Sequence, residues 1–149
     1  MSAEVRALNS KPASIIVWDF YDGAYGPSIL AVLPDLAAVA RLQDIFVHVA
    51  SSGIATDLAQ ETGMQVRNMD SLELVRTDPQ HGERRTLSRI DNARFRWSCS
   101  AHQWHRHAAL LDGFVKGHRG HHYLTEEGLD EALIEISYGE SHPGMEPKP

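Results

Sequence analysis

Residues 93–104, ARFRWSCSAHQW, join the two kinds of element that decide the fold. Their first half alternates apolar and polar side chains, with Phe95, Trp97 and Cys99 on the apolar side. This period of two is typical of a strand with one buried face and one wet face. The pair Asp91–Asn92 precedes the strand and suits a two-residue hairpin turn, because both residue types tolerate positive φ. We therefore expect an antiparallel partner strand just before this turn.

The second half of the same stretch predicts a helix. Ser100 and Gln103 have the spacing of a capping box, so the helix is expected to begin at Ala101 and to run to about Lys116. Another helix is expected over residues 35–51, where apolar side chains recur at helical spacing. These are the two principal helices of the chain.

The remaining apolar runs predict mostly strands. Compact β-branched runs at 13–20 and 28–33 are expected to form a hairpin, and a last strand is expected over 133–140. Hairpins outnumber crossovers in this order of elements. The sequence therefore predicts an α+β fold with the two principal helices packed on one face of a mainly antiparallel sheet.

The length of 149 residues is that of one domain. We expect a single domain over residues 13–140, between a flexible lead-in over 1–12 and a flexible tail over 141–149. The chain lacks an apolar run of about 18 residues, so no membrane association is expected. It also lacks a secretory signal and has a single cysteine. These features together predict a cytoplasmic protein.

The net charge of −6 is concentrated near the end of the chain. Residues 121–149 contain seven acidic residues and one lysine, a net of −6, whereas residues 67–106 contain eight arginines and five acids, a net of +3. A dedicated nucleic-acid binder needs a basic face, so no nucleic-acid partner is expected. An acidic surface instead favours a protein partner with a basic surface.

Tyrosines lie close to these acids in the sequence, and tyrosine is enriched in interfaces. We therefore expect a partner-binding face built from both residue types. Its members are Tyr123, Glu126, Glu127, Asp130, Glu131, Glu135, Tyr138 and Glu140.

The segment 102–122 holds six of the nine histidines and raises a second hypothesis, a small zinc- or manganese-dependent hydrolase. Its metal ligands would be His102 and His105, one helical turn apart, completed by residues of the following loop, namely His118, His121 or His122. Without such a metal, we expect no cofactor and no catalytic residue, because Cys99 lies on the side of its strand expected to be buried.

A resemblance favours the binding hypothesis. The order FRWSCSAHQW, HAALLDGFV, GHHYL and DEALIEISYGE, over about residues 95–140, resembles small bacterial immunity proteins, the antidotes of contact-delivered toxins. The resemblance implies a non-enzymatic inhibitor that neutralises a toxin by binding and occlusion. A third hypothesis is a structural or assembly subunit, including a homodimer formed through an edge strand.

Overall fold

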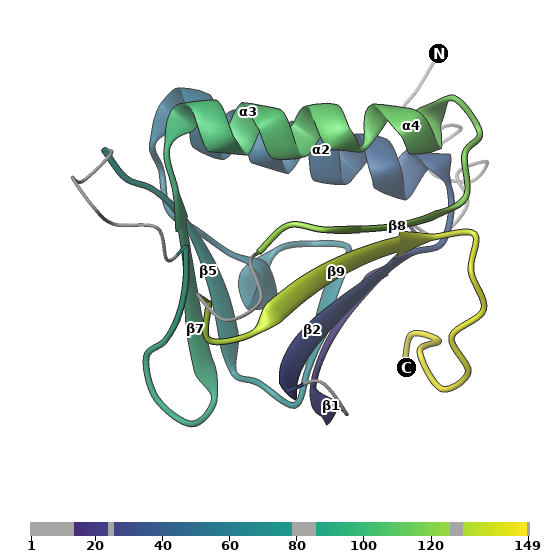
Figure 1. Ribbon diagram of the computed structural model, residues 1–149, viewed down its shortest axis with the longest axis horizontal. Helices are drawn as coiled ribbons and strands as arrows, with labels where there is room; N and C mark the ends of the chain where they lie inside the picture. Colours follow the sequence, from purple (N-terminus) through teal and green to yellow (C-terminus); the bar gives the residue numbers. More distant parts are fainter. Residues whose placement is uncertain (1–13, 24–25, 79–85, 126–129, 149) are drawn as a thin grey trace, which may run out of the picture.

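The computed structural model describes residues 14–23, 26–78, 86–125 and 130–148. Figure 1 shows the two principal helices lying side by side above the strands, which form two sheets. This arrangement confirms the predicted α+β fold, with the helices on one side of the strands.

The first sheet has five strands. They are β1 (Ile16–Gly23), β2 (Gly26–Leu33), β4 (Met64–Arg67), β8 (Gly120–Tyr123) and β9 (Leu133–Tyr138), in the spatial order β4-β1-β2-β9-β8. The predicted hairpin of β1 and β2 forms its centre. β4 and β9 flank this hairpin in parallel, and β8 closes the far edge antiparallel to β9.

The second sheet has four strands. They are β3 (Thr56–Asp57), β5 (Ser71–Arg76), β6 (Leu87–Arg89) and β7 (Arg94–Cys99), in the order β3-β5-β7-β6. The β3–β5 and β6–β7 pairs are antiparallel and the β5–β7 pair is parallel. Across both sheets, four described pairings are antiparallel (β1–β2, β8–β9, β3–β5, β6–β7) and three are parallel (β1–β4, β2–β9, β5–β7), which agrees with the mainly antiparallel prediction.

The first principal helix, α2 (Leu36–Ser52), lies where the sequence predicted it. The side chain of Asp35 caps it by accepting a hydrogen bond from the Ala38 amide at 2.9 Å, and Gly53 ends it with a φ of 70°. Between α2 and β4, the chain forms a single 3-10 turn, η1 (Leu58–Gln60). Within the described residues, no helix is both long and apolar enough to cross a membrane.

The second principal helix, α3 (Ala101–Leu110), begins with the predicted capping box but ends earlier than expected. Its last turn closes with an i→i−3 hydrogen bond, from the Leu111 amide to the Ala108 carbonyl at 3.2 Å, and a short helix, α4 (Asp112–Val115), follows. Gly113, a poor helix former, lies just beyond the break. The break turns Phe114 into the core at 2% exposure, whereas Val115, which the uninterrupted pattern would bury, is 50% exposed.

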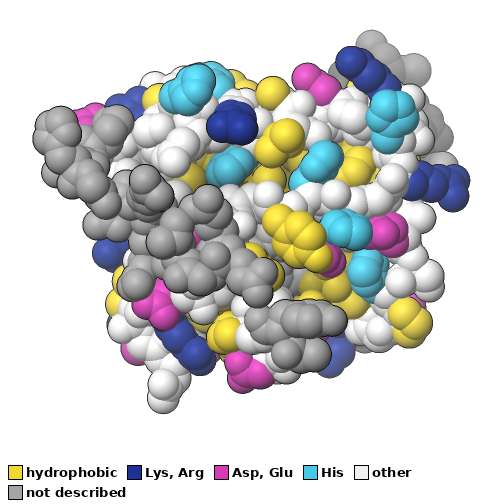
Figure 2. Space-filling view, viewed as in Figure 1, with side chains coloured by type: hydrophobic (Ala, Val, Ile, Leu, Met, Phe, Trp, Pro, Cys, Tyr) yellow, Lys and Arg dark blue, Asp and Glu magenta, His cyan; other side chains and the backbone are white. Residues whose placement is uncertain are grey.

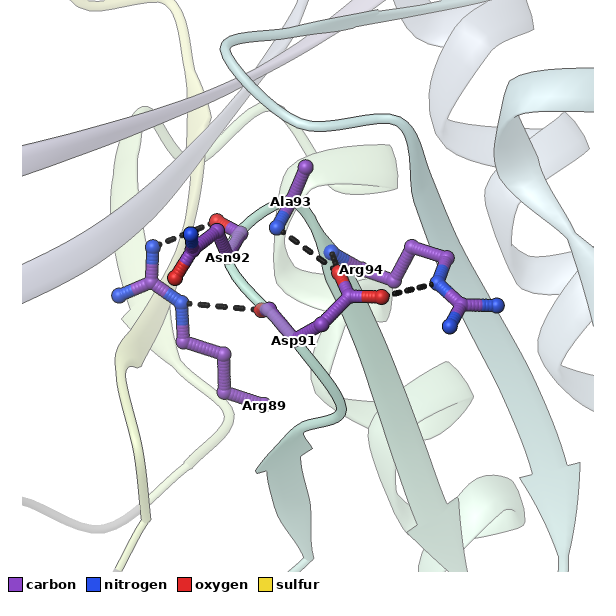
Figure 3. A network of polar contacts seen from close by, with 5 residues as sticks. All are labelled: Arg89, Asp91, Asn92, Ala93 and Arg94. Atoms are coloured by element: carbon purple, nitrogen blue, oxygen red, sulfur yellow. Dashed lines mark hydrogen bonds and ion pairs between the residues drawn. The ribbon is translucent and has the colours of Figure 1, made fainter.

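The turn between β6 and β7 is also longer than the predicted two residues. The Ile90 amide donates to the Arg94 carbonyl at 2.8 Å, so three residues lie between the paired positions. Figure 3 shows that the Asp91 carboxylate holds this turn by accepting from the amides of Ala93 at 3.0 Å and Arg94 at 3.1 Å. Since side-chain bonds shape the turn, Asp91 and Asn92 do not adopt positive φ.

Aromatic rings join the helices to the second sheet. The ring of Trp104 on α3 lies 4.8 Å from that of Trp97 on β7 and 5.5 Å from that of Phe46 on α2, measured between centroids. The Trp104 indole N–H donates to the Val75 carbonyl at 3.0 Å. Burying three large rings with a satisfied polar group fixes the helix pair on this sheet.

Candidate functional site on the outer face of the five-stranded sheet

Strand register aligns one row of side chains across the whole five-stranded sheet. Gln65, Val17, Val32, Ser137 and His121 occupy neighbouring positions on β4, β1, β2, β9 and β8. Their neighbours along the strands belong to the core, so this row points to the opposite side. We call that side the outer face.

A second row lies beside the first on the outer face. It consists of Arg67, Asp19, Leu30, Glu135 and Tyr123, again one residue from each strand. The Asp19 carboxylate accepts a hydrogen bond from the Asn68 side chain at 2.7 Å. The face therefore carries apolar residues at its centre and polar residues towards both edges.

A polar cluster forms where the chain leaves β9. The Ser137 hydroxyl donates to Glu140 Oε1 at 2.8 Å, and His121 Nδ1 lies 3.0 Å from the same oxygen. His142 Nε2 lies 2.8 Å from Ser137 Oγ. Because the hydroxyl has one proton, a serine that donates to Glu140 accepts from an N–H of His142.

Electrostatics follow from this geometry. The Ser137 hydrogen bond, followed by the contact with His121, lowers the pKa of the Glu140 carboxyl below its usual range. Ser137 is only 1% exposed although it belongs to the outer face, because the residues after β9 fold back over it. A hydroxyl covered in this way is better placed to hold chain segments together than to attack a substrate.

Residues 139–148 then cross the outer face, from β9 to the opposite edge at β4; we call this segment the strap. The Arg67 guanidinium on β4 donates to the carbonyl of Gly144 at 2.8 Å and to that of Glu146. Gln65 exchanges two hydrogen bonds with the main chain of Lys148, at 3.0 and 3.1 Å. Side chains of the edge strand thus hold the backbone of the strap.

An apolar cavity of about 200 Å³ remains between the strap and the sheet. Its walls come from the strands on one side and the strap on the other. They are Ile15, Val17, Val32, Pro34, His142, Met145, Glu146 and Pro147. The strap therefore covers the apolar centre of the outer face without filling the space beneath it.

The part of the outer face beyond the strap carries exposed tyrosines. Tyr123 is 54% exposed and Tyr21 is 43% exposed. A hydrogen bond to Glu135 raises the pKa of the Tyr123 phenol, because the neutral phenol is the donor. We call Tyr21, Tyr123, Glu135 and Asp19 the tyrosine–acid surface.

The predicted partner-binding residues are distributed over different parts of the fold. Tyr123, Glu135 and Glu140 lie on the outer face or at its edge, whereas Tyr138 points inward, its ring 5.5 Å from that of Phe114.

Asp130 and Glu131 attach their segment to the second sheet. The Asp130 carboxylate accepts from the amides of Thr86 at 2.6 Å and Leu87 at 2.7 Å, and the Glu131 amide donates to the Leu87 carbonyl at 3.2 Å. Glu126 and Glu127 lie outside the described residues. The outer face therefore gathers only part of the predicted set.

Histidine side chains are spread across the face formed by α3, α4 and β8 (Figure 2). His102, His105 and His118 are exposed, and the ring of His122 packs against that of Phe114 at 5.1 Å. Of the five histidines considered as ligands, His121 enters the polar cluster. In the part of the chain that the structure describes, no three His, Cys, Asp or Glu side chains are grouped to hold a metal ion.

Cys99 and His107 form a separate buried pair. Burial raises the pKa of the Cys99 thiol, and burial next to Arg106 lowers the pKa of His107 to about 4. A buried thiol with a raised pKa is a poor nucleophile. The pair is thus part of the core rather than a reactive site.

Ser137, His142 and Arg67 are the site residues that sequence reasoning missed. The alternation in β9 places Ser137 opposite Ile134 and Ile136, which is a signal for the outer face. Nothing local signals its partners, because Arg67 and the strap are distant in the chain. No protein family, curated protein or solved structure matches this chain.

Proposed function

We propose that the protein is a binding module for a basic protein and that the tyrosine–acid surface is where the partner docks. The observation that carries this proposal is the pairing of Tyr123 with Glu135 on the exposed part of the outer face. Tyrosine supplies a large contact area at low entropic cost, and a neighbouring carboxylate adds a directed charge.

Charge complementarity supports a basic partner. Asp19, Glu135 and Glu140 give this face carboxylates, while the guanidinium of Arg67 is bound to carbonyl groups of the strap. The whole chain also carries a net charge of −6. The negative electrostatic potential of these groups accelerates encounter with a positively charged surface and disfavours acidic competitors.

We further propose that the protein acts as an immunity-type inhibitor that neutralises a bacterial toxin in the cytoplasm by covering its active site. The resemblance of residues 95–140 to immunity proteins supports this reading, as do the small size and the acidic surface. Inhibition by occlusion requires a rigid binding surface but no catalytic residues. The sheet provides that rigidity, since the two rows of outer residues are held in register by five paired strands.

The experiment mixes the purified protein with the product of the adjacent gene and follows complex formation by light scattering and calorimetry. A one-to-one complex that abolishes the partner's activity is the expected result. A stable homodimer with no affinity for that product would support the assembly-subunit hypothesis instead. An excess of protein that leaves the partner fully active would contradict occlusion.

A further inference from the structure

We propose that the strap opens from the outer face as a unit while the rest of the domain stays folded, and that Arg67 is its latch. Opening would uncover Val17 and Val32, the apolar residues beneath it. The strap would then control how much of the outer face is available. The opening itself is a property of the free protein, whereas its role in partner binding rests on the proposed function.

The attachment at β4 depends on two side chains rather than on strand pairing. Arg67 donates to two strap carbonyls, and its Nε also donates to Gln65 Oε1 at 3.1 Å, which orients the amide that binds Lys148. Within the described residues, the strap adds no strand to either sheet. Removing the Arg67 guanidinium therefore removes two of the four side-chain hydrogen bonds that hold the strap at this end, and it also removes the contact that orients the Gln65 amide.

The other end has the geometry of a hinge. Gly139 follows β9 directly with a φ of 75°, a conformation that side chains with a Cβ rarely adopt. The side chain of Arg119 lies where a Cβ of residue 139 would project. Beyond the hinge, His142 Nε2 lies 2.8 Å from Ser137 Oγ, a contact that does not involve the side chains of β4.

Packing beneath the strap is incomplete. The cavity of about 200 Å³ is lined by Val17 and Val32 of the sheet and by Met145 and Pro147 of the strap, so these side chains do not fill the space between them. Dispersion attraction depends on close packing, so side chains that face each other across a gap lose much of this attraction. Segments with few buried contacts and exposed backbone hydrogen bonds open locally at lower free energy than the core.

The test is residue-resolved hydrogen exchange by NMR on the full-length protein. The amide of Lys148, bonded to Gln65 Oε1, reports on detachment of the strap from β4, whereas the amide of Met145, bonded to the His142 carbonyl, reports on the turn inside the strap. Arg67→Ala should speed the exchange of the Lys148 amide by about tenfold or more, with the amides of α2 unchanged. Arg96→Ala is the matched control, because Arg96 binds Glu73 at 2.9 Å on the second sheet.

Two results would overturn the proposal. One is unchanged exchange of the Lys148 amide in Arg67→Ala, which would remove Arg67 as the latch. The other is exchange of the strap at the same rate as the core, which would mean that the strap opens only with global unfolding. If Arg67→Ala fails to fold, Gln65→Ala and Arg67→Lys provide the same comparison. Partner binding plays no part in these measurements, so they stand or fall independently of the docking proposal.

Discussion

Nε2 of His107 on α3 lies 3.7 Å from Sγ of Cys99 on β7, inside a box formed by the rings of Phe46, Trp97 and Trp104. The other ring nitrogen, Nδ1, is buried and has no hydrogen-bond partner among the described residues. The imidazole is therefore held neutral, since a charged ring here would lack an acceptor and its hydration.

This environment predicts a specific loss of stability in acid. The pKa of His107 is lowered from 6.5 to about 4, so between these values the unfolded chain binds a proton that the folded chain does not. Stability should fall as the pH decreases from about 6.5 to about 4, by at most about 3 kcal/mol from this group, and should not depend on it above 6.5. Urea titrations of His107→Leu should show a flatter pH profile than the wild type. His105→Leu, which changes an exposed histidine on the same helix, is the control, and an identical profile for all three proteins would refute the assignment.

Cys99 should be unreactive in the folded protein. Burial raises the pKa of its thiol, and its side chain is fully enclosed. A disulfide reagent such as DTNB at pH 8 should therefore label it only as fast as the protein unfolds, and denaturant should release one reactive thiol per chain. Immediate stoichiometric labelling of the native protein would show that the thiol is accessible.

Asp130 is expected to matter for stability. Its carboxylate accepts hydrogen bonds from the amides of Thr86 and Leu87 at the start of β6, so Asp130→Ala should cost about 1–3 kcal/mol in the free energy of unfolding. Asp44→Ala, on the exposed side of α2, should change stability by less than about 0.5 kcal/mol. Equal effects in chemical denaturation would mean that the contacts of Asp130 contribute nothing net.

Metal content distinguishes the binding module from the metal-dependent hydrolase. Protein purified without a tag or a chelator should contain far less than one equivalent of zinc or manganese by elemental mass spectrometry. His102→Ala should leave both this content and the fold unchanged. One equivalent that is lost in His102→Ala would favour the hydrolase and would turn attention to substrates.

Much of the fold follows from local patterns. The capping box of Ser100 and Gln103 and the alternation along β7 and β9 are read from neighbouring residues, and the structure has the helix and the two strands at these positions. The break at Leu111 was not predicted, because it is decided by which of Phe114 and Val115 the core accommodates. Helical periodicity extended at constant pitch through residue 111 cannot predict which of these two side chains is buried.

The candidate site was harder to predict because it depends on contacts between distant segments. Ser137 and His121 come together through the pairing of β8 with β9, and Arg67 meets the strap 77 residues later in the chain. The acidic residues of the predicted partner-binding face also differ in their tertiary contacts. Asp130 caps strand amides, whereas Glu135 stays on the outer face, a distinction that residue type alone does not make.

The most direct test of the docking proposal is the association rate of Glu135→Lys with the purified product of the adjacent gene, measured by stopped flow at low and high salt. Asp44→Lys is the control, because it makes the same change of charge on α2, away from the outer face. We expect Glu135→Lys to slow association by about tenfold at low salt, with a smaller effect at high salt, while Asp44→Lys stays close to the wild type. Equal rates for the two variants would contradict docking through the tyrosine–acid surface.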